Sequence, residues 1–522
     1  MLIWKPKKAV LFRLNHPERI TSVIPTAKLV KHEGQVLVAV PHRPDETAVL
    51  RNLGFAVPPP IKHHYEWSGP YNPYEVQLES ATFLSQHTRA YLLNGMGTGK
   101  TNTSLWAYDY LRSVRAVRRV LVVAPLSTLE RTWADTVFRI FPHLSYAVLH
   151  GSAQRRRKLL KAEHDIYIVN HHGLKVIAND LKERNDIDLV IVDELAVFRN
   201  NQTDLWKNLN VVLNKQCPRR AWGLTGAPTP NEPTDAWAQC KLINPTHPDL
   251  PKYFSGFRER SMNQIDQYTW RAKPTANDEV QKIMQPSIRY SLDDCTDLPE
   301  SVLIDREVEL TDEQKLAYDQ MLRKLAAEHA NGEITAANQA VKVGKLVQIG
   351  CGVAYDAQGD HVTMDCSSRI NELIEIIEES EGKVLVFAPF TGVIEHIAAE
   401  LRKRWEIGVV HGGVGKDARD LIFRRFQDKQ DPMHVIVANP GTMSHGLTLT
   451  AATTTCWYAP INSADTYTQA NARVRRPGQT KASLIVRMSA SPAERKIYGR
   501  LDGKIEMQDL LLDLIKEQEL VE

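Results

Sequence analysis

The sequence predicts an α/β protein with two doubly wound parallel sheets in tandem, preceded by a small α/β appendage. The main observation is a series of short apolar runs that alternate with helical stretches, as parallel strands covered on both faces do. The runs fall into two groups, one between residues 67 and 245 and one after residue 380. Between the groups, residues 246–370 are less regular and favour helix. No apolar run approaches the roughly 20 residues of a membrane span.

The first 66 residues are expected to form the small appendage and its linker. Residues 35–40 read QVLVAV and predict a short strand. Pro44 then begins a helix and Gly54 ends it, because proline suits the first helical position and glycine the position just past the last turn. Three consecutive prolines at residues 58–60 predict a stiff linker to the first sheet.

Charge is distributed unevenly along the chain. The net charge is +3, yet residues 1–65 hold ten Lys and Arg against four Asp and Glu, whereas residues 502–522 hold two against seven. A basic N-terminal segment suits a phosphate backbone, although a solvated surface explains the same charge equally well. The six cysteines lack metal-ligand spacing, which favours a reducing compartment over disulfides or structural zinc. Because there is no apolar leader, we expect a cytoplasmic protein in a bacterial or phage setting, or a nuclear one in a eukaryote.

Apolar runs mark the strands of the two sheets. Each run is nearly continuous and ends in polar residues, so its side chains are expected to be buried on both faces of a sheet. In the first sheet the runs are residues 90–93, 118–126, 164–170, 187–194 and 220–226. In the second sheet they are residues 382–390, 406–413, 434–440 and 453–460.

A glycine-rich loop follows the strand at residues 90–93. Residues 94–101 read NGMGTGKT, the phosphate-loop pattern of glycine, four residues and Gly-Lys-Thr, except that Asn94 replaces the first glycine. Backbone N–H groups of such a loop face phosphates at a helix start, while Lys100 reaches the β- and γ-phosphates and Thr101 binds Mg²⁺. Asn94 lies at the loop entrance, away from the phosphates, and asparagine tolerates positive φ better than most residues.

An acidic pair ends the apolar run at residues 187–194. Asp193 is expected to hold Mg²⁺, and Glu194 to polarise the attacking water. An acidic pair at a strand end is often only a helix cap. Here it follows a phosphate loop in a parallel α/β context, and this favours ATP hydrolysis.

The series of motifs resembles that of a known family. In order they are YNPYEVQ (71–77), NGMGTGKT (94–101), VVAPLSTLERTW (122–133), VLHGSAQRR (148–156), VDEL (192–195), LTGAPTPNEPTDAW (224–237), VLVFAPF (384–390), VVHGGVGKDARDLIFRRFQ (409–427), SHGLTLTAA (444–452) and QANARVRRPGQTK (469–481). The series resembles the Swi/Snf-type ATPases of helicase superfamily two, in which a non-glycine at the first loop position is usual. The resemblance implies two tandem RecA-like lobes with helical insertions, ATP and Mg²⁺ as cofactors, and double-stranded DNA as the partner of a monomer.

The resemblance also implies a role for each matching residue. It assigns cofactor contacts to Tyr74, Gln77, Gly95, Met96, Gly97, Thr98, Gly99, Lys100, Thr101, Gly446 and Gln469. It assigns catalysis at the γ-phosphate to Lys100, Asp193, Glu194, Arg473 and Arg476. It assigns nucleic-acid backbone contacts to Ser127, Thr128 and Thr448, and a coupling role to Thr225.

The implied domains are a basic appendage with its linker (1–66), lobe 1 (67–245), a helical protrusion and linker (246–300), and lobe 2 with its own helical insertion (301–522). The chain departs from the family pattern at two places. Leu195-Ala196 stand where Ala-His is usual, which removes a histidine that links ATP to DNA in the family. Thr448 stands where asparagine is usual, and it retains one hydrogen-bond donor.

These features predict an ATP-driven motor on double-stranded DNA with little sequence preference, because its contacts are to the backbone. The compact form without chromatin-reader domains favours DNA repair, recombination or fork remodelling. A strand-separating helicase on DNA or RNA is one alternative, although no separating hairpin is evident after residue 452. A slow nucleotide-gated DNA-binding protein is another, and Leu195-Ala196 favours it.

Overall fold

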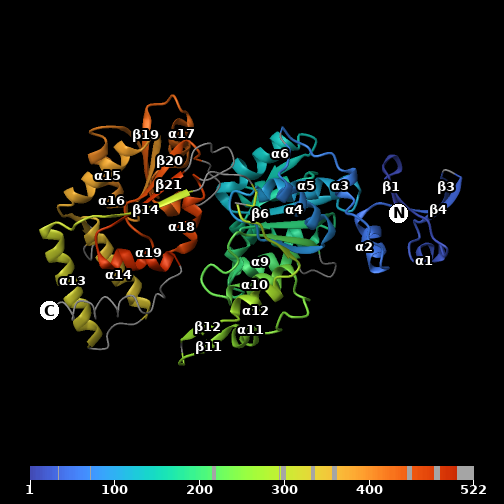
Figure 1. Cartoon of the computed structure of the whole chain (residues 1–522), viewed down its shortest axis with the longest axis horizontal. Coiled ribbons are helices and arrows are strands. Elements are labelled where there is room, and N and C mark those ends of the chain that lie inside the picture. Colours follow the sequence, from blue (N-terminus) through green and yellow to red (C-terminus); the bar gives the residue numbers. More distant parts are fainter. Residues whose placement is uncertain are drawn as a thin grey trace. The chain divides into compact units, whose positions relative to one another are not determined.

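The chain forms two compact units, Met1–Thr296 and Asp297–Glu522, each built on a parallel sheet (Figure 1). This computed structural model describes residues 1–32, 34–70, 72–213, 219–267, 269–292, 294–295, 301–330, 336–355, 361–443, 449–474 and 483–502. The two sheets with their flanking helices confirm the predicted α/β class with two tandem parallel-sheet lobes.

An antiparallel sheet forms the N-terminal appendage, with the strand order β1-β2-β4-β3. Its elements are β1 (Leu2–Trp4), β2 (Ala9–Phe12), α1 (Glu18–Thr21), β3 (Lys28–His32), β4 (Gln35–Pro41) and α2 (Pro44–Asn52). As predicted, α2 begins at Pro44, and Gly54 follows it with a φ of +89°. Val10, Val38 and Leu50 are buried in a core cluster of the appendage itself.

Seven parallel strands form the sheet of the first unit, in the order β13-β5-β10-β9-β6-β8-β7. The strands are β5 (Arg89–Leu92), β6 (Arg119–Ala124), β7 (Tyr146–Val148), β8 (Ile166–Asn170), β9 (Ile187–Asp193), β10 (Arg220–Leu224) and β13 (Ser287–Ile288). The helices around it are α3 (Ile61–His64), α4 (Glu75–Gln86), α5 (Lys100–Ser113), α6 (Asp135–Ile140), α7 (Ala153–Lys161), α8 (Leu174–Glu183), α9 (Asp204–Leu213) and α10 (Asp235–Ile243). Each strand predicted for this sheet is present.

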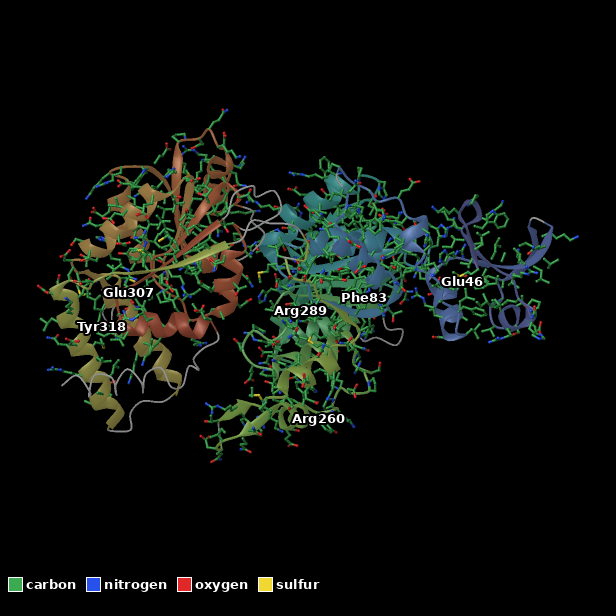
Figure 2. All side chains as sticks on the ribbon, viewed as in Figure 1. Glu46, Phe83, Arg260, Arg289, Glu307 and Tyr318 are labelled. Atoms are coloured by element: carbon green, nitrogen blue, oxygen red, sulfur yellow. The ribbon has the colours of Figure 1, made fainter. Side chains whose placement is uncertain are left out.

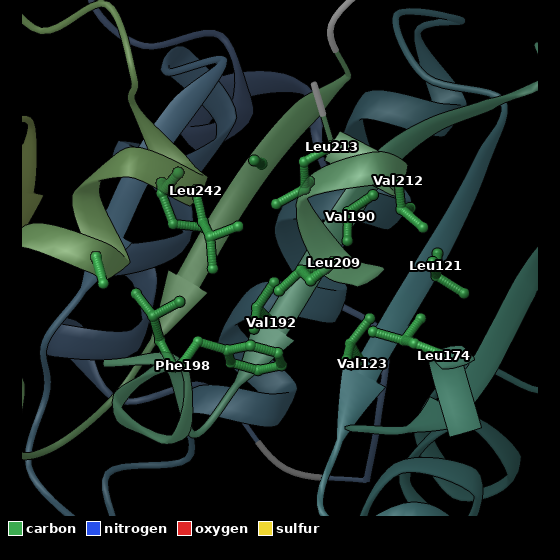
Figure 3. Packing of buried hydrophobic residues seen from close by; sticks show 14 of the residues in the cluster. Leu121, Val123, Leu174, Val190, Val192, Phe198, Leu209, Val212, Leu213 and Leu242 are labelled. Atoms are coloured by element: carbon green, nitrogen blue, oxygen red, sulfur yellow. The ribbon is translucent and has the colours of Figure 1, made fainter. Parts of the chain in front are cut away.

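Helices cover both faces of this sheet, so alternate residues of one strand enter different cores. Leu121 and Val123 of β6 belong to a cluster with residues of α8, α9 and α10 (Figure 3). Val120 and Val122 belong to a cluster with residues of α4, α5 and α6. Burial on both faces explains why the strands read as continuous apolar runs rather than alternating ones.

The interval after α10 contains strands that the sequence did not predict. It holds α11 (Phe254–Ser261), the antiparallel pair β11 (Met262–Gln264) and β12 (Trp270–Ala272), and α12 (Ala276–Ile283). Arg260 lies on this insert (Figure 2). The chain then returns as β13 beside β5, so the expectation that this interval favours helix missed an edge strand of the first sheet.

Six parallel strands form the sheet of the second unit, in the order β14-β21-β20-β17-β19-β18. The strands are β14 (Ser301–Glu307), β17 (Lys383–Phe387), β18 (Glu406–Val410), β19 (Met433–Ala438), β20 (Ala452–Trp457) and β21 (Ser483–Ser489). The other elements are α13 (Asp312–Ala330), α14 (Ala336–Gly350), β15 (Val353–Tyr355), β16 (His361–Thr363), α15 (Ser367–Glu379), α16 (Thr391–Leu401), α17 (Lys416–Gln427), α18 (Ala464–Asn471) and α19 (Pro492–Leu501). A buried ion pair of 2.9 Å between Arg369 and Glu494 joins α15 to α19.

Three chemical features of the described residues bear on the site. None of their helices is both long and apolar enough to cross a bilayer. Their cysteines, which are Cys240, Cys295, Cys351, Cys366 and Cys456, are free and buried. Within the same stretches of the chain, no group of three or more His, Cys, Asp or Glu side chains is arranged to hold a metal ion.

Candidate active site

The predicted ATP-site motifs of the first unit lie at the carboxyl ends of three adjacent strands. Strand β10 lies between β5 and β9, and its last residue, Leu224, is in register with Leu92 on one side and Asp193 on the other. The phosphate loop leaves β5, the Thr225 segment leaves β10, and Glu194 follows β9. In parallel α/β sheets, ligands bind at this edge, where strands end and helices begin.

The phosphate loop has the backbone that its sequence predicts. Gly97 and Gly99 have φ values of +79° and +80°, a left-handed conformation that glycine adopts without steric cost. Gly99 caps α5, a 14-residue helix that begins at Lys100, so the loop presents N–H groups and the positive end of a helix dipole. A Cβ on Gly99 would collide with the Gln77 amide nitrogen. The geometry suits phosphate.

The side chain of Lys100 reaches back to the first residues of the phosphate loop. Its ammonium donates hydrogen bonds of 2.9 Å to the carbonyls of Asn94 and Gly95. Burial and Glu194 raise the pKa of Asp193, and the positive charge of Lys100 partly opposes that rise. An ammonium held at this position is available to the terminal phosphates of a bound nucleotide.

Asn94, the first residue of the loop, forms side-chain hydrogen bonds to two other parts of the first unit. Its side chain is 1% exposed. Its amide donates to the hydroxyl of Ser80 on α4 at 2.9 Å, and its carbonyl accepts from the Tyr290 N–H after β13 at 3.0 Å. The explanation from positive φ is wrong, since Asn94 is not among the residues with a left-handed backbone. The role of the asparagine is therefore to hold the start of the loop through its side-chain hydrogen bonds.

Gln77 joins the start of α4 to the phosphate loop. Its amide donates to the carbonyl of Thr98 at 2.9 Å, and its carbonyl accepts from the Tyr74 N–H at 3.1 Å. Gln77 is buried, whereas Tyr74 is exposed. The pair therefore lies beside the loop, as an adenine contact requires, and the contact itself stays a prediction.

The acidic pair is held in a defined orientation. Asp193 ends β9, and Glu194 has a left-handed φ of +52°. The Asp193 carboxylate accepts from the Trp133 indole N–H at 3.0 Å and from the Glu194 N–H at 3.1 Å. Loss of hydration and the neighbouring charge of Glu194 raise the pKa of Asp193 to about 6. Two carboxylates placed together in this way favour a cation between them and a phosphate.

Thr101 and Asp193 fit the Mg²⁺ role that the sequence predicts. Mg²⁺ prefers oxygen ligands and is usually bound by one or two protein side chains together with phosphates and water. Thr101 is the second residue of α5 and Asp193 is the last residue of β9, so each offers an oxygen at the phosphate-facing edge of the sheet. When bound there, Mg²⁺ neutralises charge on the phosphates.

The Thr225 segment lies against the phosphate loop. The Thr225 N–H donates to the carbonyl of Leu92 at 3.1 Å, which continues the pairing of β10 with β5. A Cβ added to Gly226 would lie 3.5 Å from the Met96 side chain and 3.6 Å from the Asn94 carbonyl oxygen, so this segment runs close to the loop.

The predicted nucleic-acid contacts of the first unit differ in exposure. Ser127 is exposed in the short helix η2 (Leu126–Thr128) after β6. Thr128 is buried, and its hydroxyl donates to the carbonyl of Pro125 at 3.0 Å. Ser127 is thus the accessible member of the pair, and both contacts remain predictions.

The second unit holds the other predicted residues. Gln469 on α18 is buried and donates to Asp465 at 2.9 Å. Arg473 is also buried, just after α18. The predictions for Gly446, Thr448 and Arg476 fall outside the described residues. The roles of all these residues at the phosphates or the nucleic acid stay predictions.

Sequence reasoning missed two side chains that hold Asp193. Trp133 donates to its carboxylate, and a ring nitrogen of His171, which follows β8, lies 2.9 Å from its backbone carbonyl and donates to it. Trp133 lies within the quoted motif at residues 122–133, but an apolar residue in a helical stretch indicates core packing. Only the three-dimensional structure shows that its N–H reaches the acidic pair.

Two parallel-sheet lobes, with a phosphate loop and an acidic pair near neighbouring strand ends of the first, are the arrangement of a helicase-type ATPase. Residues 76–349 match the SNF2-related domain and residues 368–478 match the helicase conserved C-terminal domain. The first match covers more than half of the chain, and the protein belongs to the SNF2-related family of ATPases.

Several known proteins are similar to this chain. A putative protein of Acyrthosiphon pisum secondary endosymbiont phage 1 is 25% identical over 446 residues, covering 81% of this chain and 94% of its own. The ATP-dependent DNA helicase DDM1 of Arabidopsis thaliana is 24% identical, covering 81% of this chain and 59% of its own. An uncharacterized ATP-dependent helicase of Mycoplasma genitalium is 23% identical, and this chain spans only 38% of its length. The solved SWI2/SNF2 ATPase core of Sulfolobus solfataricus in complex with double-stranded DNA is 23% identical, with a TM-score of 0.43, covering 86% of this chain and 93% of that one.

Proposed function

We propose that the protein is an ATP-dependent translocase on double-stranded DNA that acts in DNA repair, recombination or fork remodelling. The observation that carries this proposal is the common edge of the first sheet, where the phosphate loop, the Thr225 segment and the acidic pair lie on adjacent strand ends. The names of the Arabidopsis and Mycoplasma relatives, both ATP-dependent helicases, support it. Similarity to a phage protein over most of the chain supports a bacterial or phage setting.

In this proposal, different residues of the first unit bind the phosphates, stabilise the transition state, activate the attacking water and contact DNA. Loop N–H groups bind the phosphates, and Lys100 stabilises the charge that develops during transfer. Glu194 orients the attacking water, since a carboxylate oxygen can accept its proton. Ser127, exposed after β6, contacts the backbone of one DNA strand, which makes movement independent of sequence.

Single substitutions test this assignment. Lys100→Ala should abolish ATP hydrolysis, and Glu194→Gln should retain ATP binding while turnover falls by about 10²-fold or more, as when a general base is removed. Lys158→Ala and Glu183→Gln, on the exposed faces of α7 and α8, are matched controls. Near-normal turnover of either active-site variant, measured with folded protein and duplex DNA, would contradict the assignment.

A strand-separating helicase is the second candidate, and one observation favours it. The β11–β12 pair forms a hairpin on the insert, and Ile265, which follows β11, is 63% exposed. An apolar residue on an exposed hairpin is a feature that helps to separate paired strands. ATP-dependent separation of a tailed duplex that disappears on Ile265→Ser would favour this candidate over translocation on intact DNA.

A further inference from the structure

The segment between β6 and α6 connects the proposed DNA contact to the acidic pair. It consists of η2, which contains Ser127, and a π-helical turn, η3 (Leu129–Ala134). π-helical turns are rare and occur frequently at functional sites, because the extra residue in the turn redirects side chains. Here the redirected side chain is Trp133, which lies six residues after Ser127 and five after Thr128.

Trp133 is fully buried, and its only polar side-chain atom contacts the acidic pair. Its exposed fraction is 0%, and its Nε1–H donates to Asp193 Oδ2 at 3.0 Å. An indole is a donor without acceptor capacity, so this contact holds the carboxylate oxygen in one orientation. Because the indole is neutral, it orients Asp193 without cancelling the negative charge that a cation requires.

The residues that follow the acidic pair cannot supply such a donor. Leu195 is buried beside Gly223 of β10. A Cβ added to Gly223 would collide with the Leu195 side chain. Ala196 has no polar side-chain atom. The coupling histidine expected at this place is thus replaced by apolar packing, and the donor to Asp193 comes from a different element, η3.

We propose that Trp133 is a positioning residue that couples DNA contact at η2 to ATP hydrolysis at Asp193. This inference rests on the proposed function. DNA bound at Ser127 displaces η2, the continuous π-turn carries that displacement to the indole, and the hydrogen bond reorients the Asp193 carboxylate. A displacement of about 1 Å is sufficient, because misplacement of that size changes reaction rates by about 10²-fold.

The test compares Trp133→Phe with Trp106→Phe. Trp106 is also 0% exposed, belongs to the same core cluster, and donates its indole N–H to the Ser68 carbonyl at 2.9 Å, away from the acidic pair. Both substitutions therefore remove one buried indole N–H. We expect Trp133→Phe to lower the DNA-stimulated kcat about tenfold or more, as removal of a hydrogen bond to a charged group does. Affinity for duplex DNA should change less than about twofold, and Trp106→Phe should retain the wild-type kcat.

A second variant separates positioning from packing. Phenylalanine preserves more of the indole volume but has no N–H, whereas histidine is smaller and retains a ring N–H. Positioning predicts that Trp133→His keeps more DNA stimulation than Trp133→Phe when both are assayed at pH 8. A purely structural role predicts the opposite order, and that order would overturn the inference.

A third readout does not depend on turnover. The Mg²⁺ concentration for half-maximal binding of a fluorescent ATP analogue should rise severalfold in Trp133→Phe and stay unchanged in Trp106→Phe. If duplex DNA fails to stimulate wild-type hydrolysis, the proposed function is wrong, and this Mg²⁺ shift still decides whether Trp133 orients Asp193. An unchanged Mg²⁺ dependence in Trp133→Phe would overturn the inference by itself.

Discussion

Substituting Asn94 by glycine, the residue usual at the first position of a phosphate loop, should destabilise the first unit. The change removes two hydrogen bonds from a side chain that is 1% exposed, one to the Ser80 hydroxyl and one from the Tyr290 N–H. Each such bond contributes about 1 kcal/mol, and an unsatisfied buried partner costs about 1–3 kcal/mol, so we expect the free energy of unfolding to fall by about 3 kcal/mol. Glycine adds about 0.5 kcal/mol through backbone entropy.

This destabilisation is best measured by urea unfolding with hydrogen–deuterium exchange of peptides from β5 and α5. Such peptides report the first unit alone, which matters because a chain of two units does not unfold in a single step. Asn179→Gly, at an exposed position of α8, is the matched control for the backbone cost of glycine. If Asn94→Gly destabilises no more than Asn179→Gly, the hydrogen bonds of Asn94 do not hold the loop.

Three further predictions follow from the first unit. Gly99→Ala should abolish ATP binding in a fluorescent-analogue titration, because Cβ would collide with the Gln77 amide at a φ of +80°; normal binding would contradict the loop geometry. Between the appendage and α3, Nδ1 of His42 lies 2.9 Å from Nε2 of His64. Burial lowers the pKa of both imidazoles, that of His64 to about 4. The unfolded chain then binds more protons than the folded one between about pH 6.5 and 4, so the calorimetric Tm should fall as pH drops through this window; a Tm independent of pH would refute this linkage. Replacing the exposed lysines of residues 5–8 with glutamine should lower the slope of log affinity for duplex DNA against log salt by about 0.9 for each phosphate contact that is removed, and an unchanged slope would mean that these charges are only solvated.

Strands buried on both faces were predictable from the sequence, because their apolar runs are continuous. The predicted runs nevertheless missed β7 and the inner strand β21 of the second sheet. Strands β13 and β14 were not predictable. The first has only two residues, Ser287–Ile288, and forms through pairing with β5 rather than through a pattern of its own. The second lies at a sheet edge with Val302 and Leu303 exposed, so its apolar residues do not mark a core.

The phosphate loop and the acidic pair were predictable because each is a short stretch in which neighbouring residues act on the same phosphates. The contacts of Asn94 with Ser80 and Tyr290, and of Trp133 with Asp193, were not predictable. Each joins residues far apart in sequence, and the side chains involved suit core packing equally well. Only the tertiary fold, which places helices and loops from distant parts of the chain beside one another, brings them together.

The proposed function requires movement along duplex DNA, and displacement of a triplex-forming third strand measures that movement. Tracking one strand of an intact duplex requires no base unstacking, so it avoids the roughly 1.4 kcal/mol per base-pair step that melting costs. We expect that wild-type protein with ATP and Mg²⁺ releases the third strand while the duplex stays paired, and that Lys100→Ala releases none. Separation of the duplex itself, or hydrolysis of ATP that duplex DNA stimulates without any third-strand release, would contradict the proposed function.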